Sequence, residues 1–468
     1  MVFQPEQYGI ITEMYAYVAF LVVLLTYGME TAFFRYFSQA KENPEKVYST
    51  ALWSLLVSSF VFIVAVSMFA QPIAEVLGYP NDKEYISWFG IIVGLDALIA
   101  IPLAKLRAEN KPIKFAFINF VFIAVNIGLN LFFLAYCLPK YQAGEINWLV
   151  STFYNPDTGV GYVFIANLIA SIVRFLMVAP QLFKLKFDFD IVLWKKMFRY
   201  ALPLLIAGLA GIVNETLDRV MLKWMLFADL GELETMTQLG IYGACYKLSI
   251  VITLCIQAYR YAAEPFFFDH AKQSDSRATY ARMLHVFFAF VMMIFLVVTL
   301  FIDVFKHFIP NEAYWVGLDI VPVLLLANVF LGVYFNLSVW YKLTDKTLYG
   351  SYIAIIGAII TVVLNFLLIP ILGFRGSAYA TLVCYFSMAA ISYYFGQKHF
   401  KVPYNLSKMG GYFVLALGLF FVNMFIVAES LLFMSIMRLA MVLVFTMTII
   451  YFEYYKPRID ELANRDRQ

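Results

Sequence analysis

Residues 238–246 read QLGIYGACY and repeat, with changes, the stretch QYGIITEMY at residues 7–15. Four positions match without a gap, and the pairs are Gln7 and Gln238, Gly9 and Gly240, Ile10 and Ile241, and Tyr15 and Tyr246. Two further stretches match in the same order, IGLNLFF around Asn130 and VVLNFLL around Asn365. This shared order predicts an internal repeat, in which two halves of the chain have one architecture and one orientation.

The composition defines the class of protein that contains this repeat. Of the 468 residues, 63% are hydrophobic and 14% are charged, and the mean hydropathy is +0.78. A soluble domain carries about 25% charged residues. Uncharged stretches of about 20 residues, the length that crosses a bilayer, recur along the whole chain. We therefore expect an all-α polytopic membrane protein with about thirteen spans, at 8–34, 47–69, 84–104, 115–137, 159–181, 198–226, 238–262, 283–304, 315–340, 349–369, 376–397, 410–428 and 431–454.

Lysine and arginine residues are concentrated in alternate loops. About 25 of the 34 fall in one set of loops, which includes the C-terminal tail, and only about six fall in the intervening set. Because positively charged loops remain on the cytoplasmic side, the first set is expected to be cytoplasmic. This orientation places the C-terminus in the cytoplasm and residue 1 outside.

The repeat also predicts the domain organisation. In the second copy a full helix, expected at residues 200–226, precedes QLGI, whereas six residues precede QYGI. We therefore expect that the first helix of the first copy is missing from this chain, and that the complete repeat has fourteen spans. The expected domains are a truncated N-terminal lobe of five helices at 1–189, a C-terminal lobe of six helices at 190–400, and two accessory helices with a cytoplasmic tail at 401–468. Parallel repeats are related by an axis along the membrane normal.

The sequence shows no pattern of catalytic residues. The four histidines have no metal-ligand spacing, the four cysteines lack a CxxC pair, and neither a Walker A motif nor GxSxG occurs. The longest loop expected outside, residues 139–160, contains no arginine or histidine. We therefore expect no enzymatic activity, no cofactor, no metal and no binding of nucleic acid.

Three regions carry a resemblance to a known family: PEQYGIITEMYAYV followed by YGMETAFFRYFS, QLGIYGACYKLS, and YWVGLDIVPVLLLANVFLGVYFNLSVWYKLTDKT. With two lobes and a terminal pair of helices, the chain is similar to the polysaccharide-biosynthesis branch of the multidrug/oligosaccharidyl-lipid/polysaccharide (MOP) exporter superfamily, the Wzx-type flippases. The resemblance covers nearly the whole chain and departs from the family pattern at the absent first helix. It implies a MATE-like fold, in which two lobes form an inverted V.

The resemblance further implies transport of a lipid-linked sugar. Such proteins move undecaprenyl-diphosphate-linked oligosaccharide, for O-antigen, capsule or a similar glycan, from the cytoplasmic to the periplasmic leaflet by alternating access. We accordingly expect a multi-pass protein of the bacterial inner membrane that acts as a monomer. Its expected partners are the bilayer, the lipid-linked oligosaccharide and the polysaccharide assembly machinery.

A diphosphate crossing the membrane needs cations there, and each intramembrane charge is a candidate for function because it is costly. Arg174, in IANLIASIVRFLMVAP, and Lys247, in GACYKLSIVITL, are the expected diphosphate ligands, one in each lobe. Two structural alternatives stay open. Arg174 could snorkel to the inner interface, and Lys247 could form a salt bridge to Asp96 or Glu215.

Four further residues are candidates for contacts with the substrate. Arg35 and Arg260 lie at expected cytoplasmic helix ends, where they either snorkel or form an entry ring. Asn130 and Asn365, at equivalent places in the repeat, are candidates for bonds to sugar hydroxyls, and bonds across helices are the alternative.

Three intramembrane carboxylates are candidates for binding a coupling ion, either H⁺ or Na⁺. They are Asp96, in IIVGLDALIAIP, and Glu215 and Asp218, in VNETLDRVML. For Asp218, a charge pair with Arg219 at the outer interface is the structural alternative.

Two other functions stay open at this point. A MATE-type drug/cation antiporter of the same superfamily would need a cavity dominated by carboxylates, and Arg174 and Lys247 argue against it. An integral-membrane glycan polymerase or ligase would present a large outer loop bearing arginine or histidine, which residues 139–160 lack. Efflux of cationic drugs without clearance of lipid-linked sugar would favour the antiporter.

Overall fold

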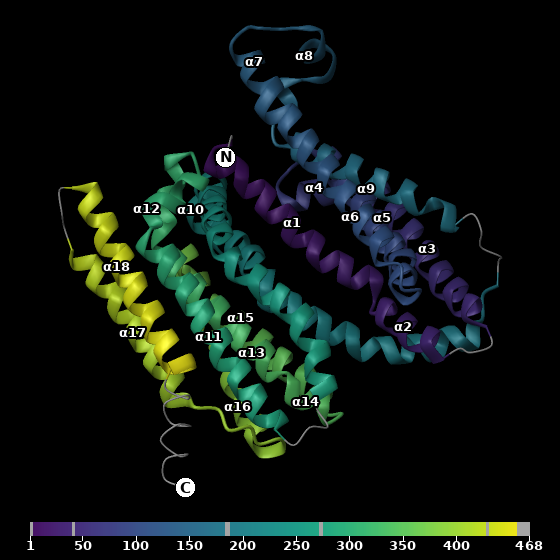
Figure 1. Cartoon of the computed structure of the whole chain (residues 1–468). Helices are drawn as coiled ribbons and strands as arrows, with labels where there is room; N and C mark the ends of the chain where they lie inside the picture. Colours follow the sequence, from purple (N-terminus) through teal and green to yellow (C-terminus); the bar gives the residue numbers. More distant parts are fainter. Residues whose placement is uncertain (1–2, 40–42, 183–187, 271–274, 427–429, 456–468) are drawn as a thin grey trace, which may run out of the picture. The chain divides into compact units, whose positions relative to one another are not determined.

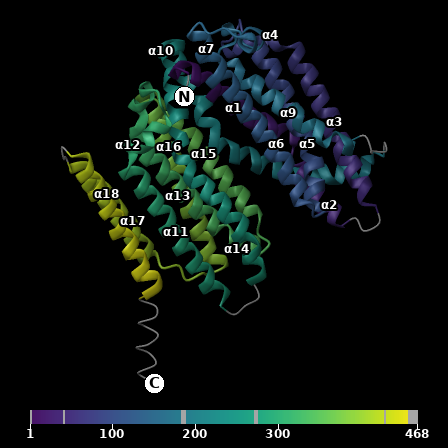
Figure 2. The same ribbon diagram turned by 45° about the horizontal axis from the view of Figure 1, so that its top comes forward.

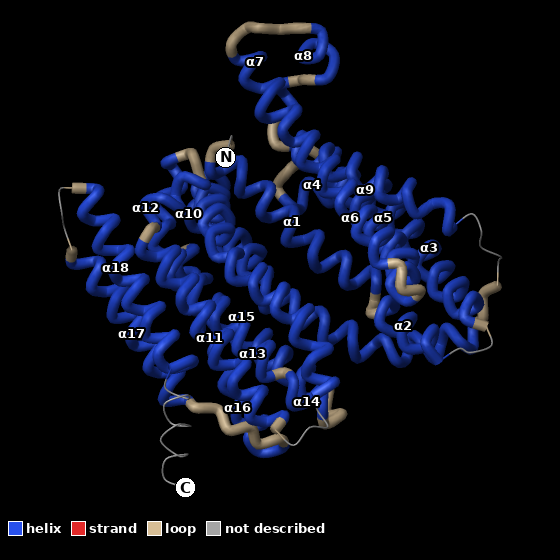
Figure 3. The backbone as a smooth tube through the Cα atoms, viewed as in Figure 1, coloured by secondary structure: helices blue, strands red, loops and turns tan. Residues whose placement is uncertain are grey.

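The computed structural model describes residues 3–39, 43–182, 188–270, 275–426 and 430–455 (Figure 1). Within these ranges every regular element is a helix and none is a strand, as Figure 3 shows. Twelve helical segments of the described chain are long and apolar enough to cross a membrane. The prediction of an all-α polytopic membrane protein is therefore confirmed. The tail after Tyr455, predicted to be cytoplasmic, lies outside the described residues.

One of the twelve segments contains two of the predicted spans. Helix α10 (Ile191–His270) is non-helical at Gly231, whose φ is 75° and ψ is 174°, so two helices meet there. A positive φ is readily adopted by glycine because it has no Cβ. The predicted spans 198–226 and 238–262 lie on either side of this residue. Counted separately, they bring the described segments to the thirteen expected.

The described helices form two compact units. The N-terminal unit runs from Ile10 to Ile212, and the C-terminal unit comprises Phe3–Gly9 and the chain from Val213 onward. The division falls inside α10, whereas the lobe boundary predicted from the sequence falls at 189/190. The three predicted domains stay a prediction.

Helix α5 is the centre of the N-terminal unit and packs against α2, α3, α4, α6 and α9. Gly90 and Gly94 of α5 let α3 approach, since a Cβ on Gly90 would lie 2.7 Å from the side chain of Val66. Small residues commonly mediate such close packing in membranes. The elements of this unit are α1 (Pro5–Thr26, from Ile10 on), α2 (Met29–Gln39), α3 (Pro44–Met68), α4 (Ala70–Leu77), α5 (Lys83–Ala108), α6 (Pro112–Asn130), η1 (Leu131–Cys137), α7 (Leu138–Gln142), α8 (Trp148–Phe153), η2 (Pro156–Thr158), α9 (Gly161–Leu182) and α10 up to Ile212.

The predicted first span, 8–34, is divided in the structure. Tyr27 and Gly28 have positive φ values of 36° and 72°, so helix α1 ends before them and helix α2 begins after them. Gly28 also approaches α10 closely, because a Cβ on it would lie 2.9 Å from the carbonyl oxygen of Ala201. The hydroxyl of Tyr27 hydrogen-bonds with Ser54 of α3.

In the C-terminal unit, α16 packs against both α13 and α15, and α11 packs against α13, α17 and α18. Figure 2 shows α17 and α18 in yellow, the predicted accessory pair. The remaining elements of this unit are α11 (Ser276–Leu300), α12 (Ile302–Phe305), η3 (Lys306–Phe308), η4 (Glu312–Ile320), α13 (Val321–Leu337), α14 (Val339–Leu343), α15 (Leu348–Leu372), α16 (Phe374–His399), α17 (Leu406–Phe425), α18 (Leu431–Ile450) and η5 (Tyr451–Tyr455).

The two copies of the repeated motif touch each other through their glycines. A Cβ on Gly240 would lie 3.0 Å from the backbone nitrogen of Gly9 and would collide with the carbonyl of Pro5. A Cβ on Gly9 would collide with the carbonyl of Met236. These neighbours are backbone atoms, which cannot move aside as a side chain can. The glycines shared by QYGI and QLGI are therefore required for this close helix crossing.

We expect Gly240→Ala to destabilise the protein. The added methyl group must push the backbones apart, and overpacking of this kind costs about 1–3 kcal/mol. The apparent melting temperature in detergent, measured by fluorescence-detected gel filtration, should fall clearly. Gly418→Ala in α17 is the matched control, because a Cβ there would meet nothing within 4 Å. An equal melting temperature for Gly240→Ala and wild type would contradict the close crossing.

Asp190, immediately before α10, forms an ion pair with Lys46 of α3. Asp190 Oδ1 accepts hydrogen bonds from the backbone N–H groups of Val192 (2.9 Å) and Leu193 (3.0 Å) and so caps α10. Its Oδ2 lies 3.0 Å from Nζ of Lys46. The N–H of Leu193 and then Lys46 lower the pKa of Asp190 below its ordinary value.

These contacts of Asp190 predict a pH dependence. A carboxyl whose folded pKa is lowered contributes stability above its unfolded pKa, and this contribution disappears as the pH falls through the folded value. Wild type should therefore lose melting temperature below about pH 4, whereas Asp190→Asn should be less stable at neutral pH and lose less on acidification. Asp157→Asn, in the exposed η2, serves as the control. The same acid-induced loss in Asp190→Asn and wild type would count against the contribution of Asp190.

Candidate functional site

The N-terminal unit holds Arg174 and Asp96 together within the membrane-spanning helices. Arg174 Nη1, from α9, lies 3.7 Å from Asp96 Oδ1, from α5. Its Nη2 donates a hydrogen bond of 2.6 Å to Asn119 Oδ1 of α6. The guanidinium carbon is also 4.9 Å from the centre of the Phe122 ring. Arg174 is thus held between α5 and α6 in this structure, and not extended toward the end of α9.

This ion pair is incomplete. A separation of 3.7 Å is too long for a good hydrogen bond. Asp96 Oδ1 and Arg174 Nε are both buried, and neither has a hydrogen-bond partner among the described residues. The side chains retain 24% and 19% exposure, respectively. Both groups therefore have capacity for a further ligand, such as an anion at Arg174 or a cation at Asp96.

Lys247, the expected ligand in the second lobe, is exposed on α10 in the C-terminal unit. Its Nζ lies 4.5 Å from the centre of the Tyr8 ring, a cation–π contact. Tyr8 in turn packs edge-on against Tyr314. Lys247 forms no salt bridge to Glu215 among the described residues of the C-terminal unit. Asp96, the other partner considered, contacts Arg174 within the N-terminal unit.

A buried polar cluster in the C-terminal unit surrounds Asp218. Its Oδ1 lies 2.9 Å from Arg219 Nη1, and its Oδ2 accepts a hydrogen bond from the Tyr242 hydroxyl. The Arg219 guanidinium carbon is 4.3 Å from the centre of the Tyr246 ring. Asp218 and Arg219 are only 3% and 8% exposed, so this pair is enclosed by protein. Glu215, the neighbouring candidate, is exposed.

Asn365 and Asn130 use their amide donors on their own helices. Asn365 Nδ2 donates to the carbonyl of Thr361 at 2.8 Å, and the residue is completely buried. Asn130 Nδ2 donates to the carbonyl and the side-chain oxygen of Asn126, both at 2.9 Å. A sugar could reach Asn365 only after the surrounding helices had moved.

The two arginines at helix ends contact aromatic rings. The guanidinium carbon of Arg35 lies 4.3 Å from the centre of the Tyr200 ring, in the N-terminal unit. That of Arg260 lies at the same distance, 4.3 Å, from Phe335 in the C-terminal unit. Arg35 is exposed and Arg260 is half-buried.

Two polar groups of the N-terminal unit, around Glu13 and Tyr15, were not among the site residues expected from the sequence. Glu13 of α1 is completely buried and accepts a hydrogen bond from the Tyr79 hydroxyl. Tyr15 receives a hydrogen bond of 2.8 Å from Asn167 Nδ2. Tyr15 and Tyr246 occupy the same position of the repeated motif, and each contacts a buried polar side chain. The repeated tyrosine was therefore a signal in the sequence for the contact with Asn167 in the first copy and with Arg219 in the second copy.

The described residues include no group of three or more histidine, cysteine, aspartate or glutamate side chains arranged to hold a metal ion. The four cysteines form no disulfide. The polar chemistry of the two units accordingly consists of ion pairs, amides and aromatic rings.

These features define an all-α polytopic membrane protein. A sequence model of the polysaccharide biosynthesis protein family matches residues 2–309, and the chain belongs to this family. The resemblance noted in the sequence is thus confirmed. Among curated proteins, none matches the sequence significantly.

Solved structures share the fold at low sequence identity. The lipid II flippase MurJ, in an inward closed conformation, has a TM-score of 0.66 and 16% identity, and the match covers 97% of this chain and 98% of that chain. An inward-facing multidrug resistance MATE family transporter of the MOP superfamily has a TM-score of 0.64 and 13% identity, with coverage of 84% and 90%. A MATE protein in the straight conformation has a TM-score of 0.57 and 13% identity, and the match covers 83% of this chain and 85% of that chain.

Removal of one partner from the Asp218–Arg219 pair should be strongly destabilising. Asp218→Ala leaves the Arg219 charge buried without its partner, which costs about 3–5 kcal/mol. Replacing both residues by leucine removes both charges and should cost less than Asp218→Ala alone. Thermal unfolding in detergent tests this order, with the exposed Glu215→Ala as the control. A double variant that is less stable than Asp218→Ala would contradict the buried pairing.

Proposed function

We propose that this protein is a flippase for lipid-linked oligosaccharide. It moves undecaprenyl-diphosphate-linked glycan, such as an O-antigen or capsule unit, from the cytoplasmic to the periplasmic leaflet by alternating access. The observation that carries the proposal is membership of the polysaccharide biosynthesis protein family on a fold shared with transporters and a lipid flippase. The proposed location is the bacterial inner membrane, with the C-terminus in the cytoplasm.

The extent of the structural likeness favours a lipid substrate over a cationic drug. The match to the lipid II flippase covers 97% of this chain, whereas the match to the multidrug transporter covers 84%. Each unit also offers an intramembrane cation, Arg174 in one and Lys247 in the other. Cations suit a diphosphate and disfavour a positively charged drug. The protein acts as a carrier and performs no covalent chemistry on the glycan.

Arg174 is proposed to bind the diphosphate in exchange for Asp96. The distance between the charged groups of Arg174 and Asp96 is long, at 3.7 Å. Each residue also has one buried atom without a hydrogen-bond partner, Nε of Arg174 and Oδ1 of Asp96. A diphosphate oxygen offers Arg174 a shorter, charge-assisted hydrogen bond than Asp96 does. A proton on Asp96 would remove its attraction for Arg174, and Arg174 is the charged group found against Asp96 among the described residues. Protonation and substrate binding would therefore favour each other, which couples the two.

Lys247 is proposed to bind the second part of the head group. Its ammonium group is exposed and is placed over Tyr8, next to Tyr314. A flexible lysine can leave an aromatic face for a phosphate without breaking a salt bridge. The vacated aromatic face is suited to the apolar side of a sugar ring. Glu215 and Asp218 are the other residues proposed to bind a coupling ion. The protein is proposed to act as a monomer, together with the polysaccharide assembly machinery.

Complementation of a flippase-deficient bacterial strain tests the function. Expression of the protein should restore surface glycan and remove accumulated lipid-linked oligosaccharide, measured by mass spectrometry of lipid extracts. Failure to clear the intermediate, together with a gain of resistance to cationic drugs, would overturn the flippase in favour of the antiporter.

Arg174→Ala and Lys247→Ala should each lower clearance about tenfold or more at equal membrane abundance, because each loses a charged contact with the diphosphate of about 1.5–3 kcal/mol. Lys140→Ala is the control, since Lys140 lies over the ring of Tyr136 in an exposed region. Wild-type clearance by both variants would remove these residues as ligands, without affecting the proposed function itself.

Asp96→Asn should make substrate binding independent of pH. In wild type, a short polyprenyl diphosphate should bind more tightly as the pH falls, because a protonated Asp96 no longer competes for Arg174. The asparagine variant should bind tightly throughout, as measured by fluorescence titration in detergent. Asp303→Asn, which alters the ion pair between the exposed Asp303 and Arg438, is the control. The same pH dependence in wild type and Asp96→Asn would show that Asp96 is not the competing group.

A further inference from the structure

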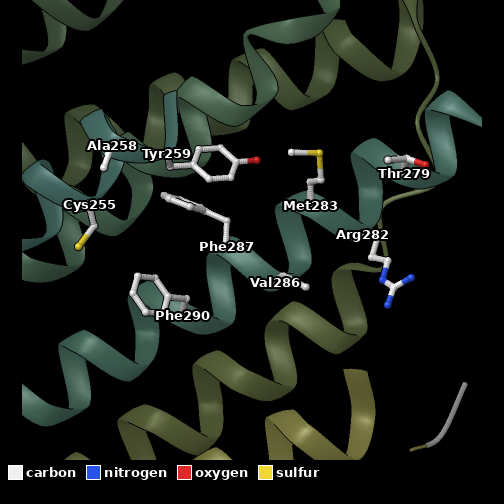
Figure 4. A pocket seen from close by; sticks show the side chains of 9 residues that line it. All are labelled: Cys255, Ala258, Tyr259, Thr279, Arg282, Met283, Val286, Phe287 and Phe290. Atoms are coloured by element: carbon white, nitrogen blue, oxygen red, sulfur yellow. The ribbon is translucent and has the colours of Figure 1, made fainter. Parts of the chain in front are cut away.

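A groove with a volume of about 600 Å³ lies between the second half of α10 and α11 in the C-terminal unit (Figure 4). Its walls are largely apolar, with Met283, Phe287 and Phe290 on α11 facing Cys255 and Tyr259 on α10. Val286 and Phe290 are each 46% exposed, so the groove opens on the surface of the described protein. A surface groove of this composition within membrane-spanning helices faces hydrocarbon more readily than water.

The polar groups of the groove are concentrated at one end. Thr279 and Arg282, from the first turns of α11, lie at one end, and Cys255 and Phe290 lie at the other (Figure 4). Arg282 is exposed and forms no ion pair within the described ranges. The hydroxyl of Tyr259, on the facing wall, has no hydrogen-bond partner there. The groove thus combines a cationic, hydrogen-bonding end with a long apolar remainder.

The length of the groove matches one leaflet of a bilayer. Thr279 and Phe290 are eleven residues apart on one helix, which is about 16 Å at 1.5 Å per residue. Half of a hydrocarbon core of about 30 Å is about 15 Å. The start of α11 belongs to the loops expected on the cytoplasmic side, which is the side of anionic lipid in many membranes.

We propose that this groove binds an anionic phospholipid of the cytoplasmic leaflet, with its phosphate at Arg282 and Thr279 and one acyl chain along α11. Charge selects the occupant, because an exposed arginine beside a hydroxyl attracts an anionic head group more strongly than a zwitterionic one. The length of the groove also favours a phospholipid, because a phospholipid acyl chain ends at mid-bilayer, as the groove does. A polyprenyl chain of the proposed substrate is much longer than one leaflet. The site does not depend on the proposed transport function.

Native mass spectrometry of the full-length protein tests the site. The protein is released from nanodiscs that contain either palmitoyl-oleoyl phosphatidylglycerol or palmitoyl-oleoyl phosphatidylcholine, and bound lipid is counted. We expect retained phosphatidylglycerol and little phosphatidylcholine. Arg282→Gln should weaken phosphatidylglycerol binding about fivefold, the effect of one cation near a lipid surface. Arg277→Gln is the matched control, since Arg277 lies on the same helix but over the ring of Phe400, outside the groove.

A second variant tests the groove independently of charge. Ala258→Trp, at an exposed position that lines the groove, should fill it and displace the acyl chain. Protection of Cys255 from alkylation by N-ethylmaleimide gives a separate readout, because the other three cysteines are buried. Phosphatidylglycerol should protect Cys255 in wild type and in Arg277→Gln, but less in Arg282→Gln and Ala258→Trp.

Two results would overturn the proposal. Equal retention of phosphatidylglycerol by wild type, Arg282→Gln and Ala258→Trp would show that the lipid binds elsewhere. Protection of Cys255 by undecaprenyl phosphate and not by phosphatidylglycerol would make the groove a site for isoprenoid lipid. Either result would leave the flippase proposal untouched, because that proposal is tested by clearance of lipid-linked sugar.

Discussion

The contact of Gly9 with Gly240 is the constraint on which the rest of the C-terminal unit depends. Backbone approaches backbone at this crossing, so only glycine fits on either helix. The crossing fixes the start of α1 against α10. It thereby places Tyr8 beside Lys247 and Tyr314, and Phe3 so that its carbonyl accepts a hydrogen bond of 2.9 Å from the Tyr314 hydroxyl. A requirement of packing therefore positions groups with a proposed role in binding.

The two units differ in how completely their intramembrane ion pairs are buried and hydrogen-bonded. In the C-terminal unit Asp218 and Arg219 are enclosed by protein, lie 2.9 Å apart and are supported by a hydrogen bond from Tyr242 to Asp218. In the N-terminal unit Arg174 and Asp96 are 3.7 Å apart, partly exposed and incompletely bonded. Because an intramembrane charge without full compensation is costly, it is retained where it does something that a neutral residue cannot do. This contrast makes Arg174 the stronger candidate for contact with substrate.

The helical spans and the repeat could be predicted from the sequence, because apolar stretches of about 20 residues and a shared motif are properties of local sequence. The break at Tyr27–Gly28 and the continuity of α10 up to Gly231 could not, since both depend on packing between distant helices. Arg174 and Lys247 were found as candidates because a charge in an apolar stretch is visible. Their partners Asn119 and Tyr8 were not, because side-chain pairing across helices leaves no local pattern.

The partial neutralisation of Arg174 by Asp96 has an electrical consequence. Moving one elementary charge through a membrane potential of 100 mV changes the free energy by about 2.3 kcal/mol. A pair with no net charge adds nothing to this work when the unloaded protein returns to its starting conformation. In the loaded state, Arg174 and Lys247 offset the negative charge of a bound diphosphate. Under the proposed mechanism, the membrane voltage would therefore do no work on the Arg174–Asp96 pair in the empty return, and would assist the loaded step less than it would assist a bare diphosphate.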